Sequence, residues 1–178
     1  EISEKYDLQI LRFFMLNAHY RSPLNFSAEL MEASKNALER IQTAVDNLNY
    51  AAEHAAAEEL TEAEGALLKE AEKFEADFDA SMDDDFNTAD AIAAVFDLVK
   101  FANTHTGEGS SRAFAEALCG RIRSLCHILG MITEKKEELL DGEIEGLIGE
   151  RQAARKAKNF ARADEIRNLL LEKGIILE

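Results

Sequence analysis

Proline, tryptophan and long apolar runs are nearly or wholly missing from this sequence. Its 178 residues hold one proline, Pro23, nine glycines and no tryptophan. Because proline and glycine interrupt helices whereas Ala, Leu, Glu and Lys favour them, this composition predicts an all-α protein. No apolar run approaches the roughly 20 residues that cross a bilayer, and no signal-peptide pattern is present, so no membrane partner is expected.

Cysteine is scarce as well. Cys119 and Cys126 stand seven residues apart on one predicted helix, about 10 Å from each other, which is too far for a disulfide. Their spacing with His127 matches no common zinc pattern, so we interpret all three as packing or surface residues. Free thiols make a reducing, cytoplasmic location the default expectation.

Positive charge is also in short supply. The chain carries 20 Lys and Arg against 35 Asp and Glu, a net charge of −15 that at first sight argues against a nucleic-acid partner. The imbalance is uneven, however. Residues 1–149 carry 13 cations against 30 anions, a balance of −17, whereas residues 150–178 carry 7 against 5, a balance of +2. Any surface that binds phosphate is therefore expected near the C-terminus.

Apolar spacing predicts a short connecting helix followed by an antiparallel four-helix bundle. The connecting segment, 1–26, contains a helix from about Asp7 to His19 that is apolar over most of its surface and is ended ahead of Pro23. The bundle occupies 27–131. Ser27 is a predicted N-cap, and Thr61 with Glu64 forms a predicted capping box. Another helix is expected to start at Thr88, and Gly130 is the predicted stop of the last one.

Two details of the bundle concern its first helix. Leu30 is placed on its inner face together with Leu38 and Ile41. Residues 51–59 are rich in alanine and either continue this helix or form a loop, and the pattern does not distinguish the two.

The end of the chain is predicted to form a separate unit. Residues 132–143 are charged and weakly periodic, which is typical of a linker. A helix over about 144–158, a turn at Asn159-Phe160 and a helix to Lys173 would form a helical hairpin within 144–178. Residues 175–177 are predicted to form a short terminal strand.

The common catalytic patterns are missing from the sequence. There is no glycine-rich phosphate loop, and the four histidines fall in separate elements. The run Asp83-Asp84-Asp85 could hold a cation, but it lacks the alternating ligands of a calcium loop. Our interpretation is that these acids precede a helix N-terminus, where they complement its dipole and cap its amides. We therefore expect no catalytic, cofactor-binding or metal-binding residue here.

Three segments, taken together and in this order, resemble cysteinyl-tRNA synthetases. Leu11–Leu16 with His19–Ser27 is similar to the segment after that family's signature loop. Met82–Thr88 looks like the family's bundle signature, and Glu150–Asp164 resembles its C-terminal anticodon-binding region. The three cover nearly the whole chain, which is accordingly identified as a C-terminal member of the family with a DALR-type anticodon-binding bundle.

The resemblance implies a class I synthetase that activates cysteine with ATP and transfers it to its tRNA. In this family the ATP-binding signatures and zinc ligands lie ahead of the part that corresponds to Glu1, so ATP and zinc are expected for a full-length enzyme, and this stretch alone is expected to be inactive. The family's chain also continues past the position of Glu178. The expected partners are cysteine tRNA and the N-terminal catalytic domain, in a monomer.

The expected tRNA contacts concentrate in the hairpin. Phe160 either stacks on an unpaired base or packs between the two helices; Arg155 can donate two hydrogen bonds to a base edge, and Asp164 can accept one from an exocyclic amine. Arg12 and Arg21 either contact phosphates or pair with nearby acids. The full set of candidates is Arg151, Arg155, Lys156, Lys158, Phe160, Arg162, Asp164, Arg167, Arg12 and Arg21.

Two alternative functions stay open at this point. A paralogue that joins cysteine to a small amine would share the connecting segment and the bundle, but Glu150–Asp164 argues against it because such relatives lack the anticodon unit. An acidic helical adaptor for basic proteins would suit the net charge but would leave the three resembling segments unexplained.

Overall fold

The computed structural model describes residues 5–131, 133, 140–156 and 159–172, without the side chains of 140–145, 153, 160–161, 168 and 171–172. The chain divides into two compact units, unit 1 (Glu1–Glu134) and unit 2 (Lys135–Glu178). All regular structure in the described residues is helical. The predicted all-α class, with a connecting helix, a bundle and a hairpin, is thus confirmed. None of the described helices is long and apolar enough to cross a membrane.

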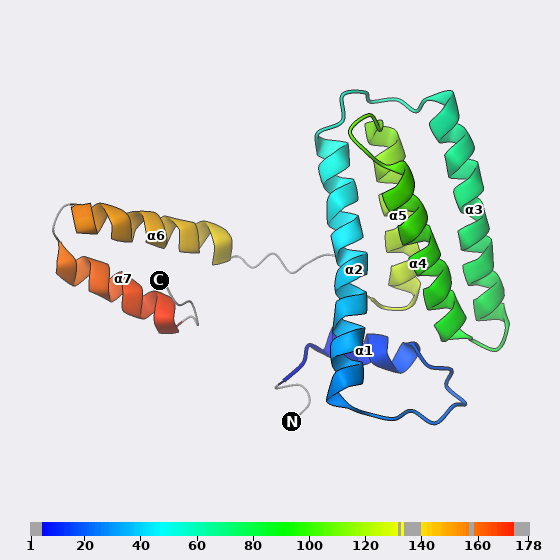
Figure 1. The fold of residues 1–178 in the computed structure, drawn as a ribbon, viewed down its shortest axis with the longest axis horizontal. Helices are drawn as coiled ribbons and strands as arrows, with labels where there is room; N and C mark the ends of the chain where they lie inside the picture. The colour runs from blue at the N-terminus through cyan, green and yellow to red at the C-terminus, as the bar shows by residue number, and fades with distance from the viewer. Residues whose placement is uncertain (1–4, 132, 134–139, 157–158, 173–178) are drawn as a thin grey trace. The chain divides into compact units, whose positions relative to one another are not determined.

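Unit 1 is a four-helix bundle with a short helix lying across one of its ends (Figure 1). The pairs α2–α5 and α3–α4 pack most closely, and α1 lies against α2 and α4. The helices, in chain order, are α1 (Leu8–Leu16), α2 (Ala28–Glu53), α3 (Glu62–Asp83), α4 (Thr88–His105) and α5 (Arg112–Ile128).

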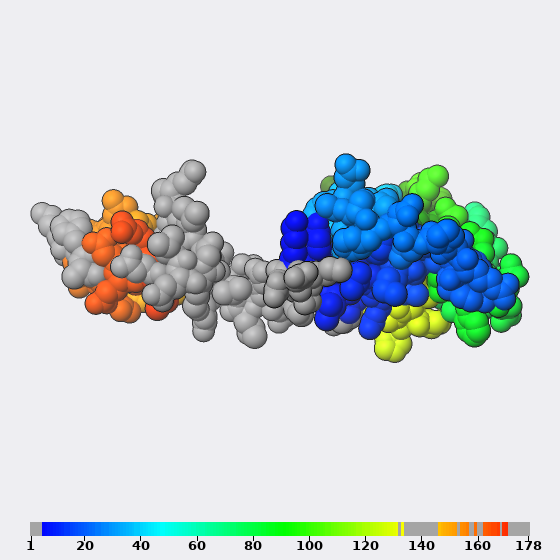
Figure 2. Space-filling model, turned by 90° about the horizontal axis from the view of Figure 1, so that it is seen from below, coloured from blue at the N-terminus to red at the C-terminus, as the bar shows by residue number. Residues whose placement is uncertain are grey.

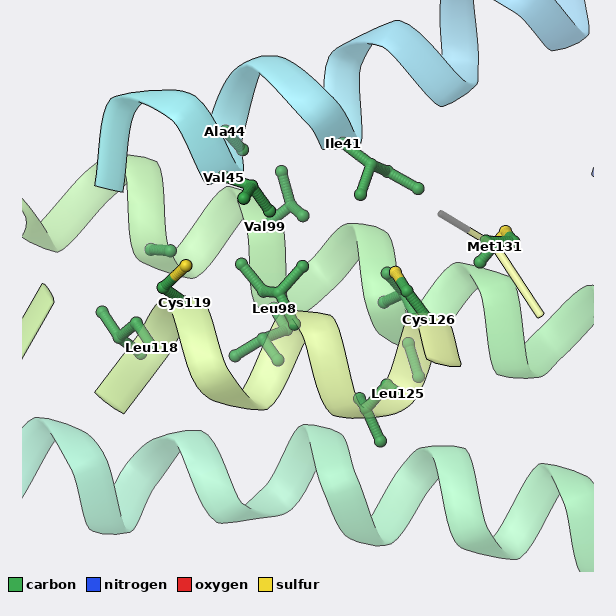
Figure 3. Packing of buried hydrophobic residues seen from close by; sticks show 14 of the residues in the cluster. Ile41, Ala44, Val45, Leu98, Val99, Leu118, Cys119, Leu125, Cys126 and Met131 are labelled. Carbon is green, nitrogen blue, oxygen red and sulfur yellow. The ribbon is translucent and has the colours of Figure 1, made fainter. Parts of the chain in front are cut away.

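The core of unit 1 is built from one face of each bundle helix. Ile41 and Val45 of α2 point toward Leu98 and Val99 of α4 (Figure 3), and all four are buried. Cys119 and Cys126 lie on α5 in the same core as free thiols, and burial raises the pKa of Cys126 to about 12. The two cysteines therefore act as small apolar residues, as the sequence predicts.

One buried carboxylate joins the starts of α3 and α5. Thr61 and Glu64 form the predicted capping box at α3. Glu64 Oε1 also accepts from the Ser111 amide at 2.8 Å, and its Oε2 accepts from the Ser111 hydroxyl at 2.9 Å, where Ser111 is the N-cap of α5. Burial alone would raise the pKa of Glu64, but the hydrogen bonds from Thr61 and Ser111 outweigh it and lower this pKa to about 2.

Other local signals are also confirmed. Ser27 caps α2, and Gly130, with φ of +66°, follows the end of α5 in the left-handed conformation that favours glycine. The open question about residues 51–59 is answered by α2, which ends at Glu53 and is followed by a loop to Thr61.

Two predictions about unit 1 are wrong. Leu30 is 44% exposed, whereas Met31, Ser34 and Leu38 are buried, so the inner face of α2 runs through these three residues and leaves Leu30 at its edge. The run Asp83–Asp85 does not cap a helix start. The run begins at the last residue of α3, Asp83, and the amides of α4 are capped by Asn87, whose Oδ1 accepts from the Asp90 amide at 3.2 Å.

Unit 2 is a hairpin of α6 (Leu140–Lys156) and α7 (Phe160–Glu172). Because α6 begins at Leu140, the end of the predicted linker is helical, and the charged, weakly periodic pattern concealed its first turn. The predicted terminal strand at 175–177 lies outside the described residues.

Candidate nucleic-acid interface

The hairpin of unit 2 holds together through a narrow apolar face. Ala163, Ile166 and Leu170 of α7 are buried, and Leu147 and Ile148 of α6 are half-buried. Asn159 begins α7 by accepting the Arg162 amide on its side-chain oxygen at 3.3 Å, and its own amide donates to the Ala154 carbonyl at 2.9 Å. This side-chain cap marks the turn that the sequence predicts at Asn159.

Arg162 is engaged inside the hairpin. Its Nε and Nη2 donate to Glu150 Oε1 at 3.1 and 3.0 Å, and its Nη1 donates to Glu165 Oε2 at 3.0 Å. The hydrogen bonds with Glu165 and Glu150 raise the pKa of Arg162. Glu150 and Glu165 were not among the candidates predicted from the sequence. Glu165 lies three residues from Arg162, within one helix turn, and Glu150 lies twelve residues away, across the hairpin. Arg162 thus stabilises the hairpin and has few donors left for RNA.

Arg155 and Lys156 have a different environment. Both are exposed in the last turn of α6, and neither forms an ion pair with another described residue. The helix dipole favours cations at the C-terminal end of a helix, and this alone would explain why Arg155 and Lys156 occur in the last turn of α6. Their charges nevertheless stay open to solvent, so they are available to neutralise phosphate.

The other candidates divide into three groups. Arg151 is half-buried, and its Nε has no hydrogen-bond partner within the described part of the chain. Arg167 and Asp164 are both exposed and lie 4.0 Å apart, so their mutual attraction is weak. Lys158 and the side chain of Phe160 lie outside the described residues, so the choice between stacking and packing for Phe160 stays open.

The two N-terminal candidates both contact the protein itself. The guanidinium of Arg12 donates to the Gly130 carbonyl at 2.5 Å and ties α1 to the end of α5. Arg21 pairs with Asp85 at 2.7 Å and lies over the Tyr20 ring, 5.4 Å from its centroid. Of the two roles considered for them, these contacts favour the intramolecular one.

The turn between α3 and α4 has an unusual backbone. Asp85 and Phe86 are successive non-glycine residues with φ of 57° and 55°. Such conformations cost roughly 1–2 kcal/mol per residue and persist where surrounding contacts fix them. Here the Phe86 amide donates to the Met82 carbonyl at 3.1 Å, and the Asn87 amide donates to the Ser81 carbonyl at 3.0 Å. The turn holds the Phe86 side chain in solvent, 68% exposed.

No group of three or more His, Cys, Asp or Glu side chains in the described ranges could hold a metal ion. Asp83 and Asp84 are exposed, and neither has a hydrogen-bond or ion-pair partner in that same part of the chain, whereas Asp85 pairs with Arg21. The acidic run therefore divides into one structural carboxylate and two open ones.

The sequence was compared with protein-family models and with known proteins. A family model described as the DALR domain matches residues 77–133, from the last turns of α3 through α5. The chain is 55% identical over 178 residues to the cysteine–tRNA ligase of Lachnospira eligens. It is 54% identical to that of Lachnoclostridium phytofermentans over 183 aligned positions and 46% identical to that of Symbiobacterium thermophilum over 179.

These three alignments cover the whole of this chain, including the hairpin, but only 38–39% of each relative's length. The matched region is the C-terminal part of the relatives. The chain is therefore homologous to the C-terminal part of cysteine–tRNA ligases and contains a DALR domain in unit 1.

Proposed function

We propose that this chain is the tRNA-contacting C-terminal region of a cysteine–tRNA ligase, in which the bundle of unit 1 is a spacer and the hairpin of unit 2 contacts the anticodon. The observation that carries the proposal is the similarity at 43–55% identity along the entire chain to proteins of that name. The full protein would activate cysteine with ATP at a site outside this region and transfer it to cysteine tRNA.

The similarity along the hairpin distinguishes this function from its nearest alternative. A ligase that joins cysteine to a small amine has no need for an anticodon-binding unit. The alignments with the relatives extend over all of residues 135–178 and are not confined to the bundle. This supports a tRNA substrate for the full protein.

Within the hairpin, charge and exposure select the residues that would contact RNA. Affinity for RNA comes mainly from cations whose charges are not already neutralised. Arg155 and Lys156 meet this condition, whereas Arg162 is held by two carboxylates. Arg155 can also donate two parallel hydrogen bonds to a base edge, so we assign it the central role and Lys156 a supporting one.

Asp164 is the proposed specificity residue. A carboxylate repels phosphate, so one that faces RNA must accept from a base donor. Asp164 is exposed and only loosely associated with Arg167, which leaves its oxygens open for such a bond. An Asp164→Asn variant should lose selectivity among anticodon variants more than it loses overall affinity. An equal loss for all anticodons would assign Asp164 a structural role.

The test of the proposal uses a hybrid ligase, in which this chain replaces the matched C-terminal region of the L. eligens relative. Arg155→Ala in the hybrid should lower kcat/KM for charging cysteine tRNA by about tenfold, the effect of losing one bidentate base contact of roughly 1–3 kcal/mol. Cysteine activation without tRNA, measured by ATP–pyrophosphate exchange, should stay unchanged.

Lys69→Ala is the matched control for this experiment, because Lys69 is an exposed cation of α3 in unit 1 and has no ion pair with any described residue. The proposal would be contradicted if Arg155→Ala and Lys69→Ala had the same effect on charging. It would also fail if Arg155→Ala reduced ATP–pyrophosphate exchange.

A further inference from the structure

Exposed apolar side chains gather at one end of unit 1. Of the eleven large hydrophobic residues that are exposed in the described part of the chain, six come from α1, the loop after it and the α3–α4 turn. Figure 2 views unit 1 from this end and shows α1 and its loop spread across it. We name this surface the apolar end; its members are Leu8, Met15, Tyr20, Leu24, Phe26 and Phe86.

Side-chain contacts fix the parts of the apolar end to one another, although they lie about 65 to 70 residues apart in the sequence. The Thr88 hydroxyl donates to the Leu16 carbonyl at 2.7 Å, and Arg21 pairs with Asp85 at 2.7 Å. A hydrogen bond between Tyr20 and Asp85 raises the pKa of Tyr20. These contacts hold Phe86 beside the loop that follows α1, in the strained turn described above.

The charges on this end disfavour RNA as its partner. Arg12 and Arg21 are both occupied by protein oxygens, and the open carboxylates of Asp83 and Asp84 would repel phosphate. Large exposed apolar side chains beside unpaired acids instead suit a protein surface that is apolar with basic residues at its edge.

The relatives suggest which protein surface this is. The larger part of each relative lies outside the region that matches this chain, and the matched region is C-terminal, so most of that additional chain precedes the counterpart of α1. The apolar end carries α1, and it is thus the end of unit 1 that a preceding domain would reach first.

We propose that the apolar end is the docking surface for the N-terminal part of a cysteine–tRNA ligase, with Met15 and Phe86 as its apolar contacts and Asp83 and Asp84 facing basic residues of that domain. This inference rests on the proposed function, because it requires the longer ligase. It adds a role for the α3–α4 turn, which the contacts with tRNA do not explain.

Hydrogen exchange of the free chain and of the hybrid ligase, both without RNA, tests the proposal. In the hybrid, amides of residues 8–26 and 84–88 should exchange about tenfold more slowly than in the free chain, as expected when side chains of this size become buried. Residues 50–60, at the opposite end of the bundle, are the internal control and should exchange equally in both proteins.

Two variants and a matched control make the test specific. Met15→Gln keeps a helix former in α1, and Phe86→Asn suits the left-handed backbone, so neither should destabilise the free chain. Both should lower the Tm of the hybrid. Tyr50→Gln removes an aromatic ring that is 64% exposed on α2 and should leave the Tm of the hybrid unchanged.

Four outcomes would overturn the proposal: equal exchange of residues 8–26 and 84–88 in the free chain and the hybrid, protection that requires added tRNA, protection of the free chain that rises with its own concentration, or an unchanged Tm for both variants. If the hybrid is insoluble, the exchange comparison is made between the intact L. eligens relative and its own matched region.

The results also distinguish this inference from the proposed function. A hybrid that charges tRNA without protecting the apolar end would contradict this inference alone. Protection combined with Arg155-independent charging would contradict the proposed function alone.

Discussion

At the scale of single residues, Glu64 has the clearest consequence for stability. Its carboxylate accepts four hydrogen bonds, from the amides and hydroxyls of Thr61 and Ser111, and it is buried between two helix starts. Since the pKa of Glu64 is lowered in the folded state, the unfolded chain binds more protons in acid. The stabilisation of the folded state by the Glu64 carboxylate is therefore complete above the unfolded pKa of about 4.3, and it is lost as the pH falls toward about 2.

Glu64→Gln should lower the free energy of unfolding at pH 7 by about 1–3 kcal/mol, because a neutral amide replaces a charged acceptor and brings one misplaced donor. The loss of stability between pH 4.5 and pH 2 should also be smaller in the variant than in the parent. Urea unfolding across this pH range measures both effects. Glu62→Gln, an exposed position in the same helix turn, is the control, and equal behaviour of the two variants would show that Glu64 is not the group responsible.

The cysteines give a second prediction at this scale. Cys119 and Cys126 are 3% and 0% exposed, and burial raises the pKa of both thiols. Because the thiolate is the reactive form, neither should react with a thiol reagent at pH 8 until the bundle unfolds. Titration with such a reagent in native buffer and in denaturant checks this, and rapid labelling of the native protein would contradict the packing.

At the scale of elements, the hairpin separates cations that stabilise it from cations that are free to bind. Arg162→Met should weaken the association of α6 with α7, since it removes the contact to Glu150 of α6; it also removes the contact to Glu165 within α7. Arg155→Ala should change the free energy of unfolding by no more than about 0.5 kcal/mol, as is usual for surface positions. Helix content against temperature distinguishes the two, and the reverse order of sensitivity would contradict the assignment.

The elements also show which features could be predicted from the sequence. Caps at Ser27, Thr61 and Gly130 were predicted correctly because each depends on residues within one helix turn. Leu30 and the acidic run were misplaced because the burial of a side chain depends on which neighbouring helices cover its face, and the position of a helix end depends on tertiary contacts. The pairing of Arg162 with Glu150 and of Arg21 with Asp85 joins separate helices or loops, so spacing along the chain could not reveal which candidate cations are already occupied.

At the scale of the whole molecule, a net charge of −15 and a proposed RNA partner are compatible only if binding depends on a few local cations. Such binding should be weak and strongly salt-sensitive, since most of the surface repels the polyanion. The prediction concerns the free chain, and it separates the two units: unit 1 should add little to affinity, and unit 2 should supply most of it.

The most direct measurement is the affinity of the free chain for cysteine tRNA, by fluorescence anisotropy, across a range of salt concentrations. Replacing Arg155 and Lys156 together with alanine should reduce the slope of log K against log salt by about 1.4, from two lost phosphate contacts at roughly 0.7 each on single-stranded RNA. Replacing Lys69 and Lys100 of unit 1 should leave the slope unchanged. Equal slopes for the parent and both double variants, or binding that does not respond to salt, would contradict the assignment of RNA contact to the hairpin.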